Sequence, residues 1–78
     1  MATYTASFDY EGTAPVKSFM ETLITVHAGF TKVKSVSVVT WEITTTQNTA
    51  TVENALETAI ENHGSYKGGK IISVTVTG

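Results

Sequence analysis

The chain lacks cysteine and arginine entirely, and its 78 residues include one proline and only five basic side chains, all lysine. The absence of cysteine excludes a disulfide scaffold, a thiolate zinc site and a thiol nucleophile. With a formal net charge of −2, the chain also lacks the basic surface that a nucleic-acid-binding protein uses to contact phosphates. We therefore expect no nucleic-acid partner.

Long apolar runs are missing as well. No stretch is apolar for long enough to span a bilayer, and the first residues do not have the pattern of a secretory signal peptide. These absences favour a cytoplasmic protein without membrane association, located in the host cytoplasm if the gene is viral. Composition does not exclude export.

Hydroxyl side chains supply most of the polar surface. Fifteen threonines and six serines stand beside a charged share of 15%, and hydrophobic residues make up 41%. This balance is typical of a globular protein with an unusually neutral surface. The length predicts a single domain over residues 1–78 with one thin core.

The first third of the chain contains a strand pattern followed by a helix pattern. Residues 3–10 alternate, with Tyr4, Ala6, Phe8 and Tyr10 on the face expected to be buried. Pro15 is suited to the first position of a helix, and Gly29 is suited to ending it. Between them, apolar side chains recur at helical spacing at positions 16, 19, 20, 23 and 24, and His27 continues the spacing.

Residues 30–47 allow two interpretations. The stretch is rich in valine and threonine and contains no glycine, proline, asparagine or aspartate that would mark a turn. The favoured interpretation is one long strand, bent by a bulge near Val38 and Val39. The alternative is a hairpin near Thr40, for which the sequence offers no turn residues.

The last part of the chain predicts a helix and then a strand. Residues 48–51 offer helix N-caps, and apolar residues from Val52 to His63 follow helical spacing up to Gly64. In residues 70–77 the alternation predicts that Ile72, Val74 and Val76 face the core.

Together these elements predict an α+β fold in the order β-α-β-α-β. We expect a small two-layer sandwich, with two helices on one face of a three-stranded sheet. If residues 30–47 form a hairpin, the order becomes β-α-β-β-α-β with four strands. That order resembles ferredoxin-like proteins in its succession of elements only.

No catalytic residue, metal ligand or cofactor is predicted. Residues 64–71 match G-x-x-x-x-G-K, but a helix precedes them and a strand follows, which is the reverse of a phosphate-binding loop. His27 and His63 each lie in the last turn of a predicted helix, where an imidazole interacts favourably with the terminal carbonyl groups. We expect both histidines to stabilise helix ends.

Two surfaces are candidates for binding a partner. If no bulge resets the middle strand, Val36, Val38 and Ile71 form an aliphatic patch on the face of the sheet without helices. A second surface is the acidic row on the second helix, where carboxylates follow one another at a spacing of four. Its members are Glu53, Glu57 and Glu61.

The function predicted from these features is that of a small non-catalytic protein-interaction module, an inhibitor or regulator that acts by surface contact. Its size and lack of catalytic motifs are compatible with a virus- or phage-encoded protein. The expected partner is another protein or a second copy in a homodimer. The alternative is an enzyme or ligand-binding domain whose site forms between subunits from His27, His63, Asp9 or Glu11.

Overall fold

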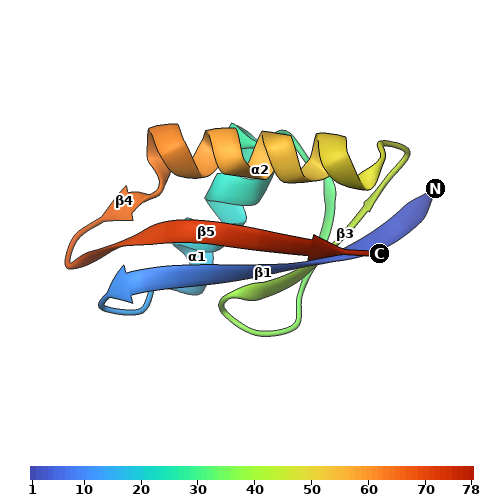
Figure 1. Ribbon diagram of the computed structural model, residues 1–78. Coiled ribbons are helices and arrows are strands. Elements are labelled where there is room, and N and C mark those ends of the chain that lie inside the picture. Colours follow the sequence, from blue (N-terminus) through green and yellow to red (C-terminus); the bar gives the residue numbers. More distant parts are fainter.

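A curled, five-stranded antiparallel sheet forms most of the computed structural model, which describes residues 1–78 (Figure 1). The strand order across the sheet is β2-β3-β1-β5-β4, so the N-terminal strand is central. In chain order the strands are β1 (Ala2–Gly12), β2 (Lys32–Ser35), β3 (Thr40–Thr45), β4 (Ser65–Tyr66) and β5 (Gly69–Thr77).

Three helical segments accompany the sheet. The short helix α1 (Lys17–Thr22) continues directly into one π-helical segment, η1 (Leu23–His27). The longer helix α2 (Thr49–His63) runs alongside β5, against which it packs (Figure 1). None of these helices has the length and apolar character needed to cross a membrane.

The predicted two-layer sandwich is wrong. The structure has five strands rather than three or four, and they form a curled half-barrel sheet that is accompanied by only short helices. Two local events produce the difference. The middle stretch divides into two strands, and the segment after α2 forms the additional strand β4.

The turn between β2 and β3 overturns the prediction of one long, bent strand. The backbone N–H groups of Val36 and Ser37 both donate to the carbonyl of Thr40, which closes the chain on itself. The indole Nε1 of Trp41 donates to the carbonyl of Val38 at 2.9 Å, and this bond anchors the turn to the core. A side chain outside the turn thus supplies the stabilisation that glycine or asparagine usually supplies within it.

The core lies between the concave side of the sheet and the helices. The amphipathic pattern of α2 buries Val52, Leu56 and Ala59, and Asn48 caps this helix by accepting from the Thr51 N–H at 2.9 Å. Fourteen buried side chains form one cluster. They are Ala6, Phe8, Met20, Leu23, Ile24, Phe30, Trp41, Ile43, Val52, Leu56, Ala59, Ile71, Val74 and Val76.

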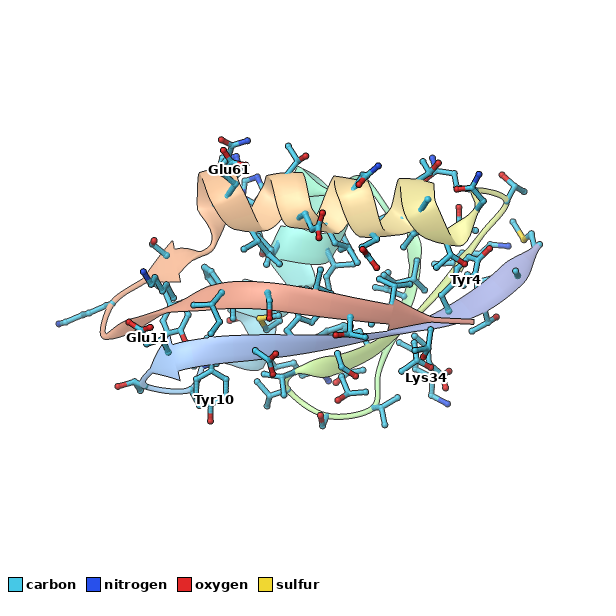
Figure 2. All side chains as sticks on the ribbon, viewed as in Figure 1. Tyr4, Tyr10, Glu11, Lys34 and Glu61 are labelled. Carbon is cyan, nitrogen blue, oxygen red and sulfur yellow. The ribbon has the colours of Figure 1, made fainter.

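A bulge changes which side chains of β5 face the core. The pairing of β1 with β5 shifts between Asp9 and Tyr10, so that Ile72 has no partner on β1. The extra residue reverses the alternation. Ile71 is therefore buried and Ile72 is exposed, opposite to the prediction. Tyr10 on β1, which was expected in the core, is also exposed and points away from α2 (Figure 2).

Candidate functional site

An open groove of about 490 Å³ lies between α2 and β5. One wall is a flank of the helix, and the other is the strand at and around its bulge. Most of the side chains that line the groove are exposed to solvent. The complete lining is Glu57, Ile60, Glu61, Ser65, Lys70, Ile71, Ile72 and Ser73.

The helical wall of this groove is acidic. Because Val52, Leu56 and Ala59 face the core, the helical period of 3.6 residues directs Glu53, Glu57 and Glu61 to one flank. Glu57 and Glu61 line the groove itself, and Figure 2 shows Glu61 on the last turn of α2. No lysine lies on α2 to offset these charges. The acidic row predicted from sequence therefore borders a concave surface.

Beyond the residues that line the groove, β5 presents unpaired backbone groups. The Phe8 N–H donates to the carbonyl of Val39, the residue just before β3, at 2.8 Å, so the backbone groups of Phe8 point away from β5. Backbone direction alternates along a strand, and Ser7 is therefore the residue that bonds to its β5 partner, Thr75. By the same alternation, the N–H and C=O groups of Val74 and Val76 point away from β1, toward the outer edge.

The outer edge of β5 is covered over only a short part of its length. β4 pairs with Lys70 and Gly69 alone, and the Ile71 N–H donates to the Gly64 carbonyl at 2.9 Å. Beyond the bulge no strand pairs with this edge up to Thr77. Unpaired strand edges of this kind readily accept a further strand.

Ile72 is the aliphatic side chain of the groove that the sequence pattern did not indicate. It is 50% exposed, whereas its neighbour Ile71 is 3% exposed. The alternation of β5 predicted an inward Ile72, and only the bulge turns it out beside Ile60. No local signal in the sequence marks this bulge.

The aliphatic patch predicted from sequence does not assemble. Val36 and Val38 are exposed, at 59% and 39%, in the turn between β2 and β3. Ile71 belongs to the core and cannot join them on a surface. The reason is again the bulge in β5, which was not part of the expected geometry.

A second free edge, that of β2, differs in character from the edge of β5. β2 has four residues, and Lys32 and Lys34 on it are exposed. Lys34 lies on the side of the sheet opposite Glu61 (Figure 2). Short strands and lysine side chains are common means of preventing unwanted pairing at an edge. The longer edge of β5 is therefore the better binding surface.

The two histidines contact each other. Their rings stack with centroids 3.7 Å apart and planes inclined by 10°, which joins the ends of η1 and α2. We predicted separate roles at two helix ends, and the spacing in sequence could not reveal this contact. Asp9, a further candidate, accepts from the Ser73 hydroxyl at 2.9 Å instead. No group of three histidine or carboxylate side chains could hold a metal ion.

Tyr66 anchors the β4–β5 hairpin at one end of the groove. Its hydroxyl donates to the Thr13 carbonyl, and its ring packs edge-on against Phe19 at 4.9 Å. Desolvation by burial raises the pKa of Tyr66 above the ordinary tyrosine value, and the nearby Tyr10 adds to this shift. A neutral phenol therefore holds this end of the groove in place.

Comparisons with known proteins bring no further functional argument. No protein-family model matches the chain, and neither a curated protein nor a solved structure matches it significantly. The groove, the acidic row and the open edge of β5 are therefore the observations from which function must be argued.

Proposed function

We propose that this protein is a small non-catalytic protein-interaction module, an inhibitor or regulator that binds another protein through the groove between α2 and β5. One observation carries the proposal: the outer edge of β5 is unpaired in the stretch that continues from the groove, and the acidic flank of α2 lines that groove. The proposal includes action in the cytoplasm, or in the host cytoplasm if a virus or phage carries the gene.

The groove combines the three features that a protein-binding surface needs. Unpaired backbone groups of β5 offer directional hydrogen bonds, and exposed Ile72 offers an apolar contact. Glu57 and Glu61 add charge, which favours encounter with a basic partner and disfavours an acidic one. A groove this open exposes its contents to water, and it is better suited to contact with a macromolecule than to enclosing a reaction.

The alternative hypothesis of an enzyme or ligand-binding domain has less support. Of the four side chains on which it depends, His27 and His63 stack on each other, and no group of three such side chains could hold a metal ion. Asp9 is engaged with Ser73. We therefore do not adopt this alternative.

Site-specific photo-cross-linking tests the proposed function. A photoreactive amino acid replaces Ile72 in the groove and, as the matched control, exposed Val26 of η1. In an extract of the organism that carries the gene, we expect one discrete cross-linked protein from position 72 and none from position 26. The same products from both positions, or no product from position 72, would contradict the proposal.

A further inference from the structure

We infer that the partner segment which binds in this groove is extended, adds to β5 as a further strand, and carries basic side chains at alternate positions. This inference rests on the proposed function and specifies the chemistry of the partner. Its three steps concern the backbone of β5, the spacing of the acidic row and the direction of the segment along the groove.

The backbone of β5 provides the first step. Val74 and Val76 direct unpaired N–H and C=O groups to the open edge, as the pairing of β1 with β3 and β5 requires. A strand placed about 4.8 Å from β5 would satisfy these groups. Strand addition takes most of its affinity from such main-chain bonds and its specificity from alternate side chains.

The acidic row provides the second step, because its spacing matches that of a strand. Successive carboxylates on α2 are four residues apart, or about 6 Å along the helix axis. Side chains on one face of a strand recur every second residue, about 6.8 Å apart. Since α2 runs alongside β5 (Figure 1), lysine or arginine at alternate positions would approach Glu57 and Glu61, the two members of the row that line the groove.

The third step concerns the direction of the segment, which the charge of Lys70 at the β4 end of the groove determines. Lys70 pairs with Ser65, the first residue of β4, and lines the groove, so a basic side chain is disfavoured there and an apolar one fits beside Ile72 and Ile60. The basic positions then follow toward the C-terminal end of β5. A second copy paired through its own β5 edge would bring two acidic rows together, which disfavours a homodimer of this type.

Synthetic peptides test this inference on the whole protein. The probe is a blocked ten-residue peptide of alternating lysine and valine. A glutamate–valine peptide controls for charge, and a lysine–valine peptide N-methylated at every second residue controls for strand pairing. Binding is measured by NMR titration of labelled protein, together with hydrogen exchange at the Val74 and Val76 amides.

We expect the lysine–valine peptide to bind saturably and to slow exchange at Val74 and Val76, while both control peptides bind at least tenfold more weakly. E57K/E61K should weaken binding about tenfold, since two exposed ion pairs are lost and charge reversal adds repulsion. The matched control E21K/E42K alters net charge equally on α1 and β3, away from the groove, and should change affinity less than twofold.

Three results would overturn the inference. Equal binding of the N-methylated peptide would show attraction by charge without strand addition. If E57K/E61K self-associates and the lysine–valine peptide does not bind the wild-type protein, the acidic row serves only to prevent pairing between the β5 edges of two copies. Absence of peptide binding while position 72 still cross-links a partner would refute this inference and leave the proposed function intact. Absence of both peptide binding and the cross-link from position 72 would refute the inference and the proposed function together.

Discussion

Replacement of Ile71 and, separately, of Ile72 tests the bulge that shapes the groove. The two residues are adjacent in sequence and chemically identical, yet Ile71 is 3% exposed and Ile72 is 50% exposed. Strict alternation along β5 would give the opposite burial. The difference in stability between variants at the two positions therefore reports the register of the strand directly.

The magnitudes follow from the burial. Truncation of a fully buried isoleucine to alanine costs about 2–5 kcal/mol, because transfer free energy is lost and a cavity remains. Truncation of half-exposed Ile72 removes much less buried area and should cost below about 1 kcal/mol. A domain this small has a total stability of only ~3–5 kcal/mol, so Ile71→Ala can unfold it. Ile71→Val, at about 0.5–1.5 kcal/mol, gives the measurable comparison with Ile72→Val.

Urea unfolding followed by tryptophan fluorescence measures both free energies, since buried Trp41 is the only tryptophan. We expect Ile71→Val to lower the midpoint with an unchanged m-value and Ile72→Val to leave it nearly unchanged. Equal losses at the two positions, or a larger loss at Ile72, would refute the bulge and with it the position of Ile72 in the groove.

Three further predictions concern stability. Asn48→Ala should cost about 1 kcal/mol in thermal unfolding because the N-cap bond of α2 is lost, and Asn48→Asp should retain most of it. Gly12→Ala should destabilise far more than Gly29→Ala in the same assay. Both glycines have positive φ, but a Cβ at Gly12 would collide with the Gly68 carbonyl oxygen, whereas a Cβ at Gly29 would have nothing within 4 Å. Equal losses would argue against the close approach at Gly12. Because the pKa of Tyr66 is raised in the folded state, the contribution of Tyr66 to stability is complete below the ordinary pKa of about 10 and is lost as pH rises through the folded-state pKa. In denaturant unfolding above pH 10, the free energy of unfolding should therefore fall more steeply with pH in the wild type than in Tyr66→Phe. The same dependence on pH in both proteins would contradict this cause.

Local pattern determined much of the secondary structure of this chain. The helical spacing from Val52 onward and the N-caps offered by residues 48–51 predicted α2, and the structure confirms a helix over Thr49–His63 capped by Asn48. Strand pattern in residues 3–10 is likewise confirmed within β1. These elements depend on neighbours within a few residues, which is why periodicity and capping suffice to locate them.

Part of the candidate site was also visible in the sequence. A spacing of four places Glu53, Glu57 and Glu61 on one flank of any helix, whatever surrounds it. The stacking of His27 on His63 was not visible, because the two residues lie on separate helical segments that only the fold brings together.

Tertiary structure alone decided the turn before Thr40, the bulge in β5 and the groove. The turn depends on the Trp41 indole, which can reach the Val38 carbonyl only when the core holds the ring. The bulge depends on the pairing of β5 with β1, residues more than sixty positions apart in the chain. Burial of Ile71 and exposure of Ile72 are set by that pairing, since two identical side chains in succession carry no preference of their own for one face of a sheet.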